Sequence, residues 1–323
     1  MEKLFKLKEH GTDVKTEIIA GITTFLAMAY ILAVNPSYLG GIDGMSAGAV
    51  FSATAISAGI ATLCMAFFAN YPVALASGMG LNAFFAFTVC GAMGYSYKVA
   101  LTAVFIEGII FMLLSLFKFR EALVNKIPSN LKFAITAGIG LFIAIIALLN
   151  ANVVVASEST TVALGELSSP TVVLSLVGLL IIGALQHYKV PGGILLGILI
   201  TWVLGIIAQL VGWYVPNPEA GVYSVIPQFS LSSFEAPKMF QFDFGFIAKN
   251  VPAFILIVFT FLYTDIFDTV GTLIGVAEKG KLLDKDGSLP NATGALMADA
   301  VGTVVGACLG TSTVTSYVES SAG

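Results

Sequence analysis

The sequence contains few charged residues. Only 11% of its 323 residues are Asp, Glu, Lys or Arg, whereas 57% are hydrophobic. About a quarter of the residues of an ordinary soluble domain are charged, so this composition excludes that class. Proteins that bind nucleic acid carry a dense basic face. The formal net charge of −4 and the lack of such a face therefore argue against nucleic acid as a partner.

Cysteine and histidine are also scarce, with three Cys and two His in the whole chain. Cys64, Cys90 and Cys308 fall inside apolar runs and show no paired spacing, so we expect neither a disulfide framework nor a metal site. His10 and His187 lie near the ends of apolar runs, where a lone His is more often solvated than a ligand. We expect no metal, no cofactor and no catalytic residues.

Long apolar runs with short polar connections make up most of the chain. A hydrocarbon core about 30 Å thick needs roughly 17–25 apolar residues per helix. We predict a multi-pass membrane protein with nine full spans and part of a tenth. The first run is too long for a signal-peptide core, so we expect it to be retained. The predicted spans are 16–39, 47–69, 74–93, 98–117, 131–150, 170–187, 192–213, 247–277, 290–309 and a tenth from Gly310 to Gly323.

The Lys and Arg positions predict the orientation of these spans, because cytoplasmic loops retain positive charge. If the N-terminus is inside, twelve of the fifteen basic residues are cytoplasmic, among them those of the connection 119–132. Only Lys98, Lys238 and Lys249 then lie on the other side. We therefore expect a cell-membrane protein with a cytoplasmic N-terminus.

Two carboxylates lie inside the eighth predicted span, in the run FLYTDIFDTVGT. A charged side chain at mid-membrane costs at least about 2.5–3.5 kcal/mol, so a carboxylate there usually faces a cavity, a partner or a substrate. Asp265 and Asp268 are three residues apart and share one face of a helix. The alternative is a structural pair that links neighbouring helices, and the hydroxyl of Thr264 fits either interpretation. Glu107, alone in the fourth span, is a weaker candidate, because a single buried Glu can be protonated or bonded to a neighbouring helix.

The third predicted span contains ALASGMGLNAFFAF, which gathers Ser77, Gly78, Gly80 and Asn82 in an otherwise apolar run. Glycines permit a break in a helix, and unwound backbone inside a membrane is tolerated only where it is buried in protein or lines a cavity. Many transporters build a midplane site on such a break, into which Asn82 would point. The alternative is an unbroken helix with a glycine-rich packing face.

The tenth predicted span begins GTSTVTSYVESSAG, an unusual density of hydroxyls for a lipid environment. We expect Thr311 to Thr315 to form a short extended segment. The spacing Ser316-x-x-Glu319 matches a capping box that opens a half-helix. Glu319 is therefore a candidate both for this capping role and for a site beside a cavity.

Four motifs, TTFLAMAYILAVNP, ASGMGLNAFF, TDIFDTVGT and TSTVTSYVESSAG, together resemble the azaguanine-resistance-type branch of the nucleobase-ascorbate (nucleobase-cation symporter) transporter family. That branch comprises adenine, guanine and hypoxanthine permeases, and the resemblance covers essentially the whole chain. It implies an all-α polytopic fold of fourteen spans in two inverted seven-span repeats, with short mid-membrane strands in spans 3 and 10. This chain would stop inside span 10. The resemblance also implies a core domain from 1–118 and 247–323 and a gate domain from 119–246.

The same resemblance implies site residues. Asp265, Glu319 and Asn82 match substrate-binding positions, and Asp268 matches a second acidic position in the eighth span. We expect Asp268 to couple transport to protons, because burial and a neighbouring carboxylate both favour retention of a proton. Aromatic side chains could cover the face of a purine ring or simply pack. Further candidates for lining the site are Thr264, Thr313, Phe84 and Phe85.

The expected function is a proton symporter that imports purine nucleobases by alternating access, with sodium as an alternative coupling ion. The expected partners are the purine, protons and the lipid bilayer, and a homodimer is left open. One alternative is an anion carrier of related inverted-repeat fold, although carboxylates in the site argue against an anion. A remote alternative is an intramembrane aspartyl protease. That chemistry needs two acids on two helices, and Asn82 stands where the second acid is expected.

Overall fold

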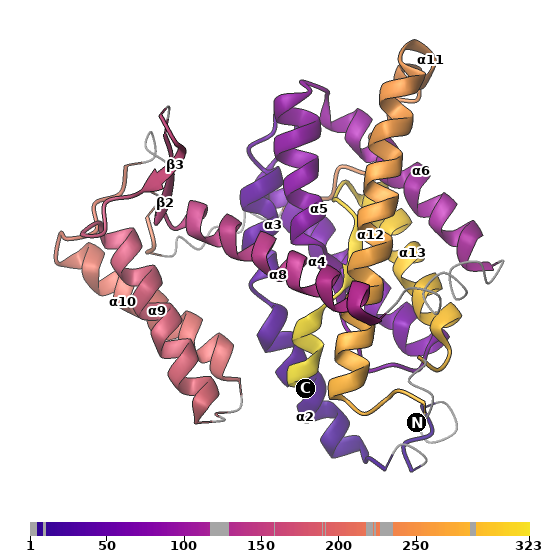
Figure 1. Cartoon of the computed structure of the whole chain (residues 1–323), viewed down its shortest axis with the longest axis horizontal. Coiled ribbons are helices and arrows are strands. Elements are labelled where there is room, and N and C mark those ends of the chain that lie inside the picture. The colour runs from indigo at the N-terminus through magenta and orange to yellow at the C-terminus, as the bar shows by residue number, and fades with distance from the viewer. Residues whose placement is uncertain are drawn as a thin grey trace. The chain divides into compact units, whose positions relative to one another are not determined.

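The chain divides into two compact units in the computed structural model (Figure 1). The first unit combines Met1–Ile139 with Ser232–Gly323, and the second is Gly140–Leu231. Most of the predicted connection 119–132 and the predicted boundary at 118 lie outside the described residues. The structure describes residues 5–8, 11–116, 129–157, 159–188, 190, 192–217, 222, 224–226, 235–284 and 289–323.

Helices fill most of the first unit. Helix α2 begins at Val14 and is capped by Asp13, whose side chain accepts a hydrogen bond from the Thr16 amide at 2.7 Å. This bond lowers the pKa of Asp13 below its usual value of 3.8. The elements are α2 (Val14–Met28), α3 (Ile31–Leu39), α4 (Ala47–Phe68), β1 (Leu75–Ser77), α5 (Met79–Ala83), the π-helix η1 (Phe84–Ala92), α6 (Tyr97–Leu116), α11 (Gly245–Lys249), α12 (Val251–Lys279), α13 (Ala292–Leu309), β4 (Val314–Ser316) and the 3₁₀-helix η4 (Val318–Ala322). Helix α8 (Ser129–Asn150) runs across the division between the two units.

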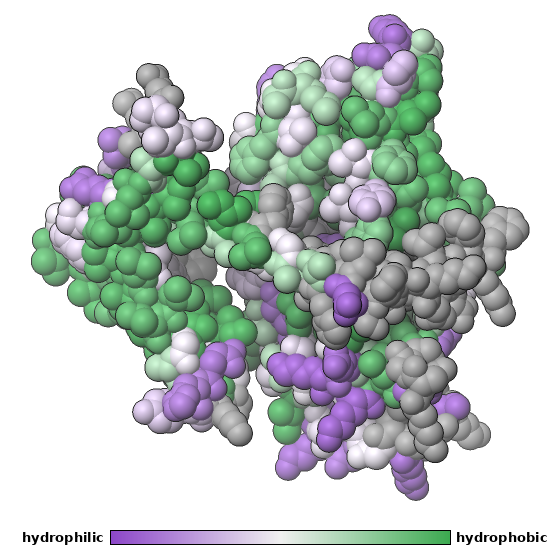
Figure 2. All heavy atoms as spheres, viewed as in Figure 1, coloured by the Kyte–Doolittle hydropathy of each residue, from purple (hydrophilic) through white to green (hydrophobic). Residues whose placement is uncertain are grey.

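Seven helical stretches of the described residues are long and apolar enough to cross a membrane. They coincide with the predicted spans 1, 2, 4 and 6–9, and the shorter helical stretch Met79–Ala92 lies in the third. Many of their large apolar side chains are exposed, including Phe25, Leu63 and Phe259. Figure 2 shows such side chains covering the viewed face of α9 (Pro170–His187) and α10 (Gly193–Leu210). The prediction of a multi-pass helical membrane protein is confirmed.

Two predicted spans are broken by strands that pair with each other. Strand β1 runs antiparallel to β4, with Leu75 opposite Ser316 and Ser77 opposite Val314, and all six strand residues are buried. A further bond from the Gly78 amide to the Thr313 carbonyl, at 3.0 Å, extends the ladder. The predicted break in span 3 is therefore confirmed, and the alternative of an unbroken third helix is wrong. The extended segment predicted at Thr311 to Thr315 is found as a strand at Val314–Ser316.

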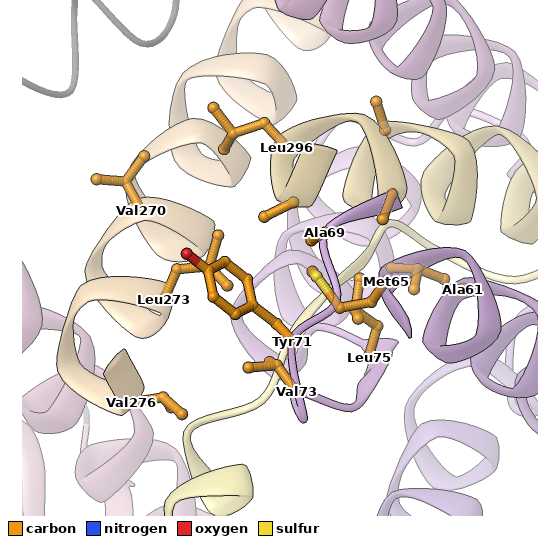
Figure 3. Packing of buried hydrophobic residues seen from close by; sticks show 14 of the residues in the cluster. Ala61, Met65, Ala69, Tyr71, Val73, Leu75, Val270, Leu273, Val276 and Leu296 are labelled. Atoms are coloured by element: carbon orange, nitrogen blue, oxygen red, sulfur yellow. The ribbon is translucent and has the colours of Figure 1, made fainter. Parts of the chain in front are cut away.

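A buried apolar cluster fixes α4, α12 and α13 around β1 (Figure 3). Met65 of α4, Leu75 of β1, and Leu273 of α12 are each at most 2% exposed. Helices α4 and α13 approach closely, since a Cβ at Gly302 would lie 2.7 Å from the Ala61 Cβ. Truncating a buried Leu in such a core costs about 2–5 kcal/mol, so the strand pair rests on a rigid support.

The second unit contains a helical pair and a hairpin. Helices α9 and α10 lie so close that a Cβ at Gly178 would be 2.5 Å from the Thr201 hydroxyl oxygen. Both helices line a pocket of about 500 Å³, to which α10 contributes Trp202. Strands β2 (Val154–Ser157) and β3 (Thr161–Leu164) form an antiparallel hairpin. The predicted helical fold with strands only in spans 3 and 10 missed this hairpin, although β-branched runs on either side of SESTT are a strand signal.

Candidate functional site

The β1–β4 pair joins α12 through hydroxyl groups. Thr269 of α12 and Thr315 of β4 have hydroxyl oxygens 3.0 Å apart. The Ser316 hydroxyl donates to the Thr269 carbonyl oxygen at 3.4 Å. The polar face of α12 therefore lies against β4. This is the position expected if the carboxylates of the eighth span belong to a site.

Asp265 lies on this face of α12 and is fully buried. The Thr269 hydroxyl, one helical turn further on, lies 3.4 Å from Asp265 Oδ1 and donates to it. Thr269 therefore connects the Asp265 carboxylate with Thr315 on the strand pair. A threonine between a buried carboxylate and a strand orients both groups.

Asp268 and Glu319 come together near the end of β1. A Cβ placed at Gly78, the residue after β1, would lie 3.7 Å from Asp268 Oδ2, so this carboxylate faces the break in the third span. Glu319 of η4 interacts electrostatically with Asp268. Glu319 also accepts a hydrogen bond from the Tyr30 hydroxyl. Two acidic side chains from distant spans thus share one environment, and Asp265 lies one turn away along α12.

Asn82 of α5 is fully buried, and neither atom of its side-chain amide has a hydrogen-bond partner among the described residues. The same is true of the hydroxyls of Ser312 and Thr313, which precede β4. Each unpaired buried polar group costs about 1–3 kcal/mol. Such groups are typical of sites where a bound polar molecule supplies the hydrogen bonds. Asn82 and Thr313 were predicted from sequence, and Ser312 was missed.

The aromatic candidates pack against α12. Phe84, which is half-buried, and Phe85, which is fully buried, both lie edge-on to Phe261, with ring centroids 4.9 and 6.5 Å away.

The other candidate side chains differ in burial. Thr264 is exposed. Glu107 is fully buried on α6. In the part of the chain that the structure describes, no three His, Cys, Asp or Glu side chains gather as a metal site requires.

The predicted capping box is wrong. Helix η4 begins after Tyr317 and has no side-chain cap. Ser316 is the last residue of β4, and its hydroxyl bonds the Thr269 carbonyl of α12. Glu319 bonds Tyr30 instead of reaching back to the start of the helix. The strand ladder fixes the direction of the Ser316 side chain, which the local sequence spacing could not reveal.

Sequence reasoning also missed two tyrosines of the site. The Tyr317 hydroxyl donates to the Ser77 carbonyl oxygen at 2.6 Å, at the end of β1. Tyr30 lies between α2 and α3 and bonds Glu319. A hydroxyl inside an apolar span needs a partner, so the Tyr within LAMAYILAVNP was the available signal.

A buried polar network ties α3 and α4 to the strand pair. The Asn35 amide donates to the hydroxyls of Thr54, at 2.7 Å, and Thr311, at 2.8 Å. The Thr311 hydroxyl lies 3.0 Å from the Ser77 hydroxyl. All four residues are fully buried. One amide of the first span thus joins the second span to both extended segments.

Comparison with known proteins agrees with this arrangement. A model described as the Permease family (Xan_ur_permease) matches residues 15–323. Adenine permease AdeQ of Escherichia coli K12 is 43% identical over 323 residues, which are all of this chain and 69% of AdeQ. Guanine/hypoxanthine permease PbuO of Bacillus subtilis 168 is 45% identical over an alignment of 327 residues, gaps included, that covers 99% of this chain and 72% of PbuO.

Among solved structures, the transmembrane domain of a cyanobacterium bicarbonate transporter, BicA, has the same fold. Its TM-score is 0.65 at 15% identity, over 95% of this chain and 76% of that domain. The resemblance drawn from the four motifs is confirmed by the permeases above, and the protease alternative is set aside. The chain belongs to the Permease family (Xan_ur_permease) and is a membrane transporter, not an enzyme.

Proposed function

We propose that the protein is a secondary active transporter that imports purine nucleobases. The observation that carries this proposal is the buried, unpaired amide of Asn82 near a strand pair that is flanked by the carboxylates of Asp265, Asp268 and Glu319. The names of the relatives AdeQ and PbuO give adenine, guanine and hypoxanthine as the substrates of those proteins. The same class of planar base fits the groups found here.

A purine edge alternates N–H donors with ring-nitrogen acceptors. Carboxylates only accept hydrogen bonds when ionised, whereas a side-chain amide both donates and accepts. We assign the N–H groups of the base to Asp265 and Glu319, and a donor–acceptor pair of the base to Asn82. These three side chains can hydrogen-bond to the edge of a neutral base. They include no positively charged group, which an anion site would use.

Asp268 is our candidate for proton coupling. Its carboxylate faces the break after β1 and interacts electrostatically with Glu319. Sodium remains the alternative coupling ion. In this scheme the purine occupies Asp265, Asn82 and Glu319 while Asp268 exchanges the proton.

We also propose a domain division and a membrane orientation. We assign 1–118 and 247–323 to the core domain and 119–246 to the gate domain of two inverted seven-span repeats. The N-terminus is cytoplasmic, because that orientation leaves only three basic residues outside. Alternating access then comes from movement of the core against the gate around the strand pair.

Uptake of labelled bases tests the proposal. Cells without purine uptake that express the protein should accumulate adenine, guanine or hypoxanthine, and a collapsed proton gradient should stop accumulation. Asp265→Asn and Glu319→Gln should each lose purine binding, whereas Asp268→Asn should still bind but no longer concentrate the base. Purine accumulation by Asp268→Asn under a proton gradient would contradict the coupling assignment.

An anion carrier is the second candidate, because BicA transports bicarbonate and shares the fold. The three carboxylates argue against it, since they would repel an anion. Bicarbonate uptake without any purine uptake in the same cells would favour the carrier and overturn the purine proposal.

A further inference from the structure

Tyr30 lies where the first span changes from one helix to the next. Helix α2 ends at Met28 and α3 begins at Ile31, with a tight turn in which the Leu32 amide donates to the Ala29 carbonyl at 3.1 Å. The Tyr30 ring packs against a buried cluster that contains Met28, Ile31 and Tyr317. Its position is therefore fixed by packing on both sides of the turn.

The Tyr30 hydroxyl donates to the Glu319 carboxylate, which comes from η4 at the far end of the chain. Other titratable groups face the same place: Asp268 of α12 and Tyr317, which follows β4, both interact electrostatically with Glu319. Lys279 at the end of α12 donates to the Ser321 hydroxyl at 3.2 Å, two residues beyond Glu319. Among these groups, Tyr30 is the one with a described hydrogen bond to Glu319.

We propose that Tyr30 is a positioning residue for the purine site, because its hydroxyl holds the Glu319 carboxylate beside Asp268 at the end of β1. This inference rests on the proposed function, in which Glu319 accepts an N–H of the base. A Glu side chain on a five-residue 3₁₀-helix has few constraints of its own. A donor that orders the carboxylate beforehand removes that ordering from the cost of binding.

Replacement of the hydroxyl alone tests this role. In detergent-purified protein, Tyr30→Phe should weaken hypoxanthine binding about tenfold at neutral pH, the order expected for a lost hydrogen bond to a charged group. Tyr71→Phe is the matched control, because it removes a hydroxyl that bonds the Pro290 carbonyl. Its affinity should equal that of the wild type.

A double-mutant cycle separates this inference from the proposed function. In the unliganded protein, thermal unfolding of Tyr30→Phe, Glu319→Gln and the double variant should show non-additive effects at neutral pH, because the two residues share one bond. Additive effects, or a wild-type affinity in Tyr30→Phe, would overturn the role of Tyr30. If the wild type binds no purine but the cycle is coupled, the proposed function fails while the Tyr30–Glu319 link stands.

Discussion

Two buried asparagines of this protein have opposite surroundings. Asn35 donates two hydrogen bonds to buried hydroxyls, whereas the amide of Asn82 has no hydrogen-bond partner in the described ranges. Both are fully buried. The Asn35 amide nitrogen is paired, although its carbonyl oxygen has no partner among the described residues. Removal of an amide that donates to buried hydroxyls leaves those hydroxyls without a donor, while removal of an amide with no partner relieves a desolvation cost. The two positions therefore separate a structural amide from a binding amide.

We expect Asn82→Leu, a substitution of similar volume, to raise the free energy of unfolding of the unliganded protein by about 1 kcal/mol while it weakens purine binding. Asn35→Leu is the control and should lower that free energy by about 1–3 kcal/mol, because Thr54 and Thr311 lose a donor. Thermal unfolding and equilibrium binding measure both effects. A destabilised Asn82→Leu protein with unchanged affinity would place Asn82 in the packing and not in the site.

The element that organises the site is a two-stranded ladder in which one glycine permits close approach. A Cβ at Gly78 would lie 2.7 Å from the Thr315 Cγ2. Thr315 cannot turn away freely, because its hydroxyl lies 3.0 Å from that of Thr269. The approach of the chain after β1 to β4 thus depends on the absence of a side chain.

Gly78→Ala should cost about 1–3 kcal/mol of stability through overpacking and should also weaken purine binding. Thr315→Ser, which removes the Cγ2 but keeps the hydroxyl, should restore both in the double variant. Gly59→Ala is the control, because nothing lies within 4 Å of a Cβ there. Its helix should be slightly more stable. Failure of Thr315→Ser to rescue Gly78→Ala would show that the clash is not the cause.

The sequence predicted the membrane spans and the break at Gly78, because the residues of each segment alone are enough to indicate its structure. A lipid-crossing helix must be long and apolar, so the spans were located within a few residues, and glycines marked the break at Gly78. The partners of Tyr30 and Ser316 were missed because they lie 289 and 47 residues away in the sequence. The acids were found because carboxylates are rare in apolar runs, but no local pattern tells which of them meet.

At the scale of the molecule, the first unit holds the strand pair, the three carboxylates and Asn82 on one framework of helices. Its helix α13 packs along α4 and α6, and α6 also packs along α12. We therefore expect this unit to move as one body in a transport cycle, as the proposed core domain requires.

Spin labels can test that expectation in a variant whose three cysteines are replaced. A label pair at the exposed positions Phe67 and Phe259, both in the first unit, should keep its distance distribution when purine binds. A pair at Phe67 and Leu180, one in each unit, should change its distribution. An equal change in both pairs, measured by pulsed electron resonance, would mean that the first unit is not rigid. The replaced residues are Cys64, Cys90 and Cys308.

The pairing of β1 with β4 also has a consequence for how the protein is made. The Tyr317 hydroxyl and its acceptor at Ser77 are 240 residues apart. At a synthesis rate of roughly 5–20 residues per second, the third span waits about 10–50 s for its partner. During that time the Leu75 amide can use the Thr62 hydroxyl, which lies 3.0 Å from it, but the rest of β1 has no ladder. Unpaired backbone is costly in lipid, so the nascent third span must stay beside an insertion machinery or a wet protein surface until the chain beyond Thr313 arrives.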